Sequence, residues 1–135
     1  MSTMRLQIIS PYKIIFDGEC TMLEYNTTEG YVGVLPGHIA MTQIVAPGKL
    51  AVYEDGKEKP MYAALISGIV KIMPDLVTVL AEIIDLKENI DVDRAKESKE
   101  RAEKRLADKI DDLDVARAER AITRANIRLA VAELN

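Results

Sequence analysis

The stretch DVDRAKESKERAEKRLADKIDDLDVARAERAITRANIRLAVAELN, residues 91–135, decides how the whole chain is organised. It contains no glycine, proline or aromatic residue, and nearly every second residue in its first half is charged. All glycines and prolines, which mark turns and end helices, lie before it. The sequence therefore predicts two regions that meet near Asn89. Residues 1–88 carry the turn signals, and residues 89–135 are predicted to be helical.

Small apolar residues recur with helical spacing in two segments of this stretch. The first stripe consists of Ala95, Ser98, Ala102 and Leu106, and the second of Ala118, Ala121, Ile122, Ala125, Leu129 and Ala132. Between them, the short acidic side chains of residues 111–114 are typical of a helix N-cap. We predict helices at residues 92–109 and 115–133, joined into an antiparallel hairpin. Because alanine buries little area, at about 25 cal/mol per Å², the hairpin should be weakly held and able to move.

Residues 1–88 have the pattern of a β-fold. Short apolar runs are separated by turn signals such as Pro47-Gly48, Asp55-Gly56 and Ser67-Gly68. The predicted strands cover residues 4–9, 14–16, 19–25, 33–35, 40–45, 49–53, 61–66, 69–72 and 76–81. Many short strands with turns roughly every 8–12 residues are typical of a β-sandwich or barrel. We therefore predict an N-terminal all-β sandwich followed by a C-terminal antiparallel two-helix hairpin.

Length and charge limit the classes of function. The 135 residues suit one ordinary domain, or a domain of about 90 residues with an appendage. Residues 1–90 hold seven basic and eleven acidic residues, which accounts for the net charge of -4, whereas the remainder holds eleven of each. Since contacts to a phosphate backbone need a surplus of lysine and arginine, nucleic-acid binding is disfavoured.

The number of cysteines and the length of the apolar runs indicate the cellular compartment in which the protein works. Cys20 stands alone, which excludes an internal disulfide. No stretch approaches the ~18 apolar residues of a transmembrane helix, and the N-terminus lacks the basic start and long apolar core of a signal peptide. We therefore predict a protein that is cytoplasmic, or that rests on something that is.

One segment of the first region, residues 29–38, packs three glycines, a proline and the single histidine into EGYVGVLPGH. It fails as a phosphate-binding loop, because it has no lysine and leads into a strand-like run. His38 has no second histidine as a metal partner and no cysteine nearby in the sequence. Three interpretations of His38 stay open: a polar loop residue, a contact residue, or a catalytic residue.

At this segment the chain resembles the epsilon subunits of bacterial F-type ATP synthases, and the resemblance covers almost the whole length. It is carried by an ordered series of motifs. They are Glu29-Gly30, Gly33, Leu35-Pro36-Gly37-His38, Ser67-Gly68, Val77-Thr78-Val79-Leu80-Ala81, Ile90-Asp91-Val92-Asp93-Arg94-Ala95 and Arg124-Ala125-Asn126-Ile127-Arg128-Leu129. Each piece alone would be weak, but the order and spacing together are highly specific.

The resemblance implies a non-catalytic rotor subunit, peripheral at the cytoplasmic face of the bacterial cell membrane. The sandwich is expected to bind the gamma subunit and rest on the ring of c subunits, with Glu29, Tyr31 and His38 on the loop that faces the ring. Many family members have an acidic residue in place of Tyr31, so an aromatic contact is expected here. Ile69 also replaces a commonly seen glycine, which should stiffen or shift that turn.

Family members whose hairpin binds ATP carry an Ile/Leu-Asp-x-x-Arg-Ala motif and basic residues on both helices. This chain matches at Ile90, Asp91, Arg94, Ala95, Arg101, Arg124 and Arg128. In an antiparallel hairpin that turns near residue 113, facing residues have numbers that sum to about 225, so Arg101 faces the level of Arg124. Guanidinium groups bind phosphate bidentately, and Asp91 can cap the helix and accept hydrogen bonds from a base or ribose. ATP is thus a candidate regulatory ligand, and no cofactor is required.

Two other interpretations of the basic residues stay open. Arg117, Arg120, Arg124 and Arg128 form one stripe on the second predicted helix. In a folded hairpin, this stripe could form solvated ion pairs with carboxylates of the first helix, namely Asp93, Glu97, Glu100 and Glu103. In an extended hairpin, it would face acidic segments of the catalytic beta subunits, beside the alpha subunits, and inhibit ATP hydrolysis. ATP bound to the folded hairpin would oppose that inhibition.

The rival function is an independent small enzyme or ligand-binding sandwich with the hairpin as a dimerisation arm, and a helical adaptor for another partner is a third. Enzyme chemistry lacks its usual residues here, because no nucleophile motif accompanies His38. Asp111, Asp112 and Asp114 lack the glycine and later glutamate of a calcium loop, so no metal site is predicted.

Overall fold

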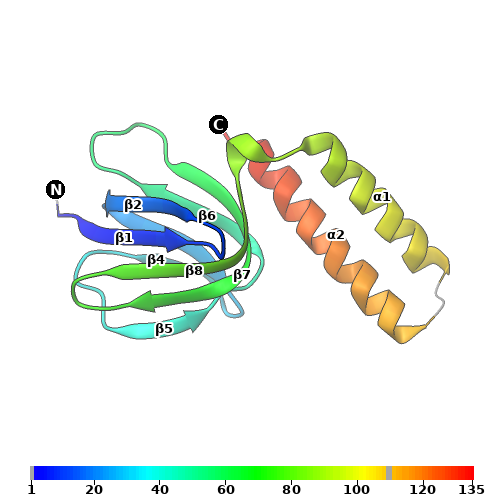
Figure 1. The fold of residues 1–135 in the computed structure, drawn as a ribbon, viewed down its shortest axis with the longest axis horizontal. Helices are drawn as coiled ribbons and strands as arrows, with labels where there is room; N and C mark the ends of the chain where they lie inside the picture. The colour runs from blue at the N-terminus through cyan, green and yellow to red at the C-terminus, as the bar shows by residue number, and fades with distance from the viewer. Residues whose placement is uncertain (1, 109–110) are drawn as a thin grey trace.

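The computed structural model describes residues 2–108 and 111–135 and consists of a β-sandwich followed by two helices (Figure 1). The strands are β1 (Met4–Ile9), β2 (Ile14–Cys20), β3 (Met22–Thr27), β4 (Gly30–Val34), β5 (Met41–Ile44), β6 (Gly48–Tyr53), β7 (Met61–Ile72) and β8 (Val77–Leu86). A short 3-10 helix, η1 (Lys87–Asn89), leads into α1 (Val92–Asp108) and α2 (Asp112–Ala132). The predicted fold class is confirmed.

The strands follow the order β2-β1-β8-β7-β6-β3-β4, and β5 pairs with β7. Neighbours are antiparallel except for β1 and β8, which are parallel. Because successive side chains of a strand point to opposite faces, alternate residues fill the space inside the sandwich. The core consists of Leu6, Ile8, Cys20, Leu23, Tyr25, Val34, Val45, Leu50, Val52, Ala63, Leu65, Val70, Ile72, Val77, Val79 and Ala81.

Several bounds of the predicted strands are wrong: β2, for example, is continuous from Ile14 to Cys20 where a break after residue 16 was expected. Two errors concern how the chain turns. Residues 19–25 were expected to be one strand, but the chain turns at Thr21, whose N–H donates to the carbonyl oxygen of Tyr53 at 2.7 Å. The turn sends β2 to pair with β1 and β3 to pair with β6. The alternation changes phase at this corner, since the core residues Cys20 and Leu23 are three apart. Residues 19–25 nevertheless resemble one strand, because no glycine, proline or other turn residue marks the corner.

The second error concerns Ser67-Gly68, which is a bulge inside the continuous strand β7 and not a turn between two strands. Gly68 has a φ of 155°, and an added Cβ would lie 2.5 Å from the carbonyl oxygen of Leu80. The glycine is therefore needed where β7 passes close to β8. β8 also runs five residues beyond the predicted end at residue 81 and reaches Leu86.

The two helices meet along the alanine stripes, as predicted. Ala95 and Ala102 of α1 and Ala118 and Ala125 of α2 are buried where the helices meet. Asp111 is the N-cap of α2, since its Oδ1 accepts a hydrogen bond from the N–H of Asp114 at 2.8 Å. That cap lets α2 begin at residue 112, three residues earlier than predicted. The predicted end of the first helix, at residue 109, lies outside the described residues.

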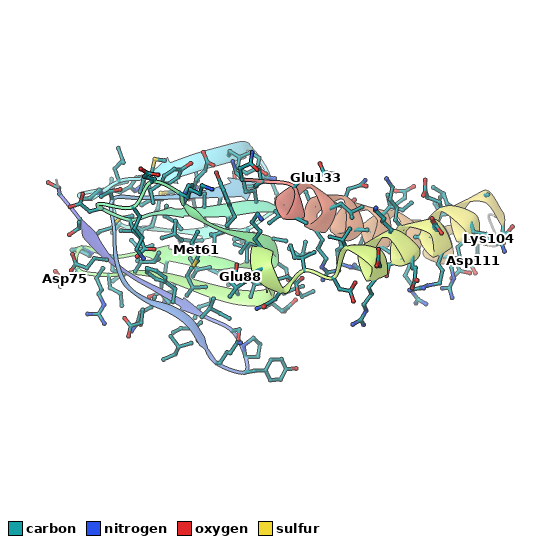
Figure 2. The ribbon with its side chains drawn as sticks, turned by 90° about the horizontal axis from the view of Figure 1, so that it is seen from above. Met61, Asp75, Glu88, Lys104, Asp111 and Glu133 are labelled. Atoms are coloured by element: carbon teal, nitrogen blue, oxygen red, sulfur yellow. The ribbon has the colours of Figure 1, made fainter. Side chains whose placement is uncertain are left out.

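The hairpin touches the sandwich through one end only. The last turns of α2 pack against β6, β7 and η1, whereas the C-terminal end of α1 and the N-terminal end of α2 lie away from the strands (Figures 1 and 2). Glu133 lies beside the sandwich in Figure 2, and Asp111 lies at the far tip. Among the described residues, no helix is long and apolar enough to cross a membrane.

Candidate functional site

The candidate nucleotide motif begins where the chain leaves the sandwich. After η1, Ile90 is extended, and Asp91 starts α1 by accepting a hydrogen bond at Oδ1 from the N–H of Arg94 at 3.1 Å. Its carbonyl oxygen also accepts from the N–H of Ala95 at 3.0 Å. The predicted capping role of Asp91 is therefore confirmed. Asp91 remains exposed, with its second carboxylate oxygen free to accept a hydrogen bond from a ligand.

Beside this cap lies a cavity of about 330 Å³, which we call the motif cavity. It is lined by Asp85, Asn89, Ile90, Asp91, Arg94, Ala95, Ser98 and Arg128. The structure thus places the four predicted motif residues, Ile90, Asp91, Arg94 and Ala95, around one space, together with Arg128 of the other helix. Carboxylate, amide and guanidinium groups face the same volume, which suits a ligand with both donor and acceptor groups.

A second cavity of about 340 Å³, the interhelical cavity, lies between α1 and α2. It is lined by Ala95, Ser98, Arg101, Ala102, Arg105, Arg117, Ala118, Ala121, Arg124, Ala125 and Arg128. The predicted facing of Arg101 and Arg124 is thus observed, since both line it. The two cavities share Ala95, Ser98 and Arg128 and therefore adjoin. A single extended ligand can reach from Asp91 to the arginines.

Five arginines around a floor of alanines make the interhelical cavity strongly basic. Arg101 Nη2 donates to Ser98 Oγ at 3.2 Å, and Arg128 Nε lies 2.7 Å from Asp85 Oδ2. Within the described ranges, the other three arginines have no carboxylate within 4.0 Å. The ion pairs expected with Asp93, Glu97, Glu100 and Glu103 do not form, so that interpretation is wrong for the folded hairpin. Unpaired guanidinium groups on one cavity are suited to a polyanion.

Sequence reasoning missed Arg105 and Asp85. Arg105 lies one turn after Arg101, and the numbers that place Arg101 against Arg124 would also have placed Arg105 near residue 120. Asp85 had no such signal, because it belongs to β8 and meets Arg128 only after the hairpin docks on the sandwich. Arg120, predicted on the same stripe as Arg117 and Arg124, is exposed and lines neither cavity.

The three residues expected on the ring-facing loop do not share a loop, so that part of the prediction is wrong. Glu29 lies in the turn before β4, Tyr31 lies within β4, and His38 follows it. β4 forms because its residues pair with β3 from Leu23 to Thr27. β4 ends the strand order and pairs on one side only, so the three residues lie along a free sheet edge.

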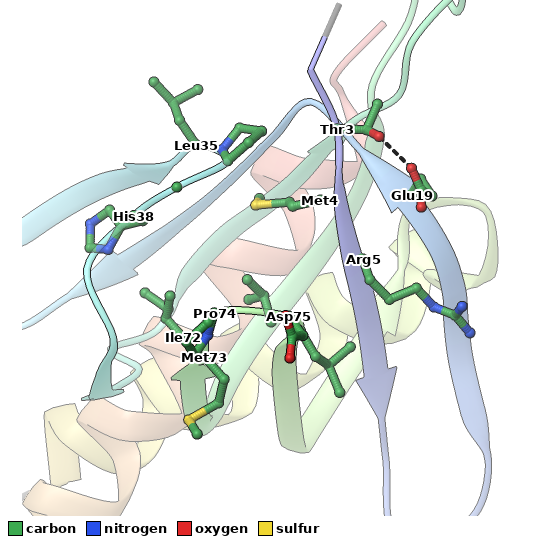
Figure 3. Close-up of a pocket in the computed structure, with 14 residues that line it drawn as sticks. Thr3, Met4, Arg5, Glu19, Leu35, His38, Ile72, Met73, Pro74 and Asp75 are labelled. Carbon is green, nitrogen blue, oxygen red and sulfur yellow. Dashed lines mark hydrogen bonds between the residues drawn. The ribbon is translucent and has the colours of Figure 1, made fainter.

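His38 lines a cavity of about 410 Å³ (Figure 3). Asp75, which lines it too, lies at the end of the sandwich away from the hairpin in Figure 2. Arg5, Glu19, Met73 and Asp75 line the same cavity. The Nδ1 of His38 lies 2.8 Å from the carbonyl oxygen of Ile39, its own neighbour in the chain. In the part of the chain that the structure describes, no group of three metal-ligating side chains occurs. His38 is thus a residue of the segment after β4 that lines a cavity beside charged side chains.

Cys20 is fully buried at the end of β2. Burial, together with the charges of Glu54 and Glu19, raises the pKa of its thiol to about 11. Because the thiolate is the nucleophile, a thiol that stays protonated at neutral pH is unreactive. Cys20 is a core residue.

An apolar row crosses the outer face of the sheet, and sequence reasoning missed it. Ile44, Ile69 and Leu80 are paired across β5, β7 and β8, and are 72%, 40% and 41% exposed. Leu80 in turn pairs with Ile9 of β1, which pairs with the 60% exposed Ile14 of β2. Five apolar residues at neighbouring positions of an outward face are unusual for a monomer and mark an interaction surface. The only sign of this surface in the sequence was Ile69 in place of a glycine. Which apolar residues lie beside Ile69 depends on strand register and could not be predicted.

Two family models match the chain. The one described as "ATP synthase, Delta/Epsilon chain, beta-sandwich domain" matches residues 3–86. The one described as "ATP synthase, Delta/Epsilon chain, long alpha-helix domain" matches residues 88–133.

Similar proteins extend over the full length. The ATP synthase epsilon chain of Ruminococcus albus is 39% identical over 133 residues, which cover 98% of each chain. That of Bacillus velezensis is 37% identical over 132 residues, again 98% of each chain. A chain in the structure of the Euglena gracilis mitochondrial ATP synthase, with OSCP, F1 and c-ring, has a TM-score of 0.84 and 22% identity, and the match covers 98% of this chain and 82% of that one. At that identity the structural likeness shows the fold alone.

Proposed function

Because this chain belongs to the ATP synthase delta/epsilon family, as a non-catalytic epsilon subunit of the central stalk, we propose that it couples the gamma subunit to the ring of c subunits and restrains ATP hydrolysis through its hairpin. The membership covers both regions, so an independent small enzyme is no longer the alternative. The observation that carries the regulatory part is the interhelical cavity, where four of the five arginines have no carboxylate partner among the described side chains.

The apolar row is the proposed contact with gamma. Its five members present adjoining apolar side chains on a rigid sheet, which is the arrangement that a partner protein covers to exclude water. A sheet face also keeps its shape on binding, so little conformational entropy is lost when the partner docks. Gamma is the proposed occupant because a rotor subunit must turn with the shaft.

The free edge at β4 is the proposed contact with the c ring. Glu29 and Tyr31 lie toward one end of this edge and His38 just beyond the other. The proposal therefore replaces a single loop by a strand edge, with a carboxylate, an aromatic ring and an imidazole spaced along it. Through these partners the chain would work at the cytoplasmic face of the bacterial membrane, attached peripherally by the complex.

ATP is the proposed ligand of the two adjoining cavities. The acceptors and donors around Asp91 suit a base and ribose, and the arginines suit the phosphates. Both cavities need α1 and α2 side by side, so a ligand that fills them binds the folded hairpin and shifts the population toward it. In an extended hairpin, the stripe of Arg117, Arg120, Arg124 and Arg128 would face acidic segments of the beta subunits and hold the rotor.

The test is ATP hydrolysis by the assembled enzyme across a range of ATP concentrations, with the full-length chain or with a chain that ends at Glu88. We expect truncation to raise hydrolysis, most strongly at low ATP. If truncation leaves hydrolysis unchanged, the hairpin is no brake, and the contacts of the sandwich with the rotor remain as the function. If truncation raises hydrolysis equally at all ATP concentrations, the hairpin is a brake that ATP does not release.

A further inference from the structure

The last turns of α2 dock on a small, well-defined part of the sandwich. A cavity of about 230 Å³ is lined by Tyr31, Lys49, Ile127, Ala130, Val131 and Leu134. Val131, at the centre of the helical side, is only 1% exposed. Tyr31 was expected to face a different subunit, but the structure places its ring at this junction.

The position of Tyr31 is fixed from two sides. Its hydroxyl accepts a hydrogen bond from the backbone N–H of Lys49 at 3.0 Å. Gly48 makes that approach feasible, because a Cβ there would lie 2.7 Å from the Tyr31 hydroxyl oxygen. A ring held at its hydroxyl has little rotamer freedom left to lose when a helix packs against it. Tyr31 is thus a preformed support for the end of α2.

Lys49 brings a positive charge to the same place. Its Nζ lies 2.9 Å from Glu24 Oε1, and 5.8 and 5.9 Å from the ring centroids of Tyr31 and Tyr62. The hydrogen bond to Glu24 raises the pKa of Lys49, so the ammonium group is charged at neutral pH. The last turn of α2 has no basic residue, and the residue that ends the helix is Glu133. Lys49 lines the same cavity as Leu134 beyond the helix end. Since a helix C-terminus carries partial negative charge, a nearby ammonium group is favourable there, even one that is paired with Glu24.

We propose that Tyr31 and Lys49 form a latch that holds the last turns of α2 on the sandwich and sets how often the hairpin leaves it. The contact between the helices is made of alanines, which bury little area, so the position of the hairpin depends on the packing of the end of α2 against the sandwich. Tyr31 adds to that packing from β4, beside the main contact of α2 with β7. Tyr31 is 52% exposed, so the latch uses only part of its surface and leaves the rest for the proposed contact with the c ring. The latch itself needs neither nucleotide nor partner subunits, so it is tested on the isolated chain, apart from the proposed function.

The test is amide hydrogen exchange of the isolated full-length chain, comparing Tyr31→Ala with Tyr12→Ala. Tyr12 is 94% exposed and lies in the turn between β1 and β2, so its variant is a matched control. Opening of the latch removes the packing of the last turns of α2 on the sandwich, so their amides exchange more readily. We expect the amides of residues 127–132 to exchange about tenfold faster in Tyr31→Ala, with the amides of β7 unchanged. Equal exchange in the two variants would overturn the latch.

A second variant removes the helical side of the contact. Leu134→Ala shortens a side chain that lines the cavity and lies outside the sandwich core. We expect about fivefold faster exchange of the same α2 amides, with β7 unchanged. If Tyr31→Ala also speeds exchange of the β7 amides, the result with Leu134→Ala decides whether the latch exists. Exchange in Leu134→Ala at the rate of Tyr12→Ala would then count against the proposal.

Discussion

Arg128 Nε lies 2.7 Å from Asp85 Oδ2, so α2 is tied to β8 by an ion pair between residues 43 apart in the chain. Arg128 also lines both candidate ligand cavities. One guanidinium group therefore belongs at once to the docking of the hairpin and to the proposed nucleotide site.

Asp85→Asn tests that link. The side chains are 30% and 37% exposed, so solvent screens the pair, and its loss should cost only about 0.2–1 kcal/mol of docking free energy. We expect a small rise in hydrogen exchange of α2 and none in β1. Asp17→Asn, which breaks the Arg5–Asp17 pair at the other end of the sandwich, is the matched control. Faster α2 exchange in that control would show that the effect is not local.

Replacing arginines of the interhelical cavity should weaken ATP binding to the isolated chain. Charge-assisted hydrogen bonds contribute about 1.5–3 kcal/mol each, so Arg124→Ala should lower the affinity roughly 10- to 100-fold in a calorimetric titration. Arg105→Ala should act in the same direction, although sequence reasoning did not single it out. Arg120→Ala is the matched control, because Arg120 lies outside both cavities. Unchanged affinity in Arg124→Ala would argue against phosphate in this cavity.

Arg120 in turn separates inhibition from nucleotide binding. On the proposed extended helix it faces the beta subunits, whereas in the folded hairpin it contacts neither cavity. Arg120→Ala should therefore raise ATP hydrolysis by the assembled enzyme about two- to fivefold, in line with loss of one rim charge. Its ATP affinity as an isolated chain should equal that of the unmodified protein. A fall in ATP affinity would contradict the assigned geometry.

The apolar row predicts where the gamma subunit binds. Ile69→Asp places a charge at the centre of the row, and burial of an unpaired carboxylate should weaken the complex at least about tenfold. The measurement is co-purification of gamma and its dissociation constant. Met73→Asp introduces the same charge at a 54% exposed residue outside the row and should leave binding unchanged. If both variants bind alike, gamma uses another face.

Cys20 predicts a loss of stability at alkaline pH. Its pKa is raised from 9.0 to about 11 in the folded chain, so folding favours the protonated thiol. That contribution is complete below pH 9 and is lost as the pH rises through about 11. Cys20→Ala should reduce the slope of unfolding free energy against pH in this window. In the folded chain at pH 8, the thiol should resist alkylation, and rapid labelling would disprove its burial.

Much of the helical region was predictable because its determinants are local. Helical spacing placed Ala95 and Ala102 on one face, and short acidic side chains marked the cap at Asp111. Arg101 and Arg124 could be predicted to face each other, because this requires only the helical periodicity of both segments and an antiparallel connection between them. The fold class of the first region followed in the same way from turn signals and strand alternation.

The strand details were harder, because alternation does not report direction. The alternation of core residues changes phase at both the corner at Thr21 and the bulge at Gly68, from Cys20 to Leu23 and from Leu65 to Val70. Such a change does not show whether the chain turns there or continues as one strand. The outward row around Ile69 and Leu80 was missed for a related reason. Which residues of different strands adjoin depends on register, and register is set by the assembled sheet.

By itself, the sequence determined a β-sandwich with a two-helix hairpin, the phase of each helix, the caps, and the face on which the arginines gather. These depend on interactions within a few residues of each other. Only the tertiary structure decided that Asp85 pairs with Arg128 and that Tyr31 supports the end of α2. Both contacts join the sandwich to the hairpin, and their geometry depends on how two separately folded surfaces fit, which no local pattern encodes.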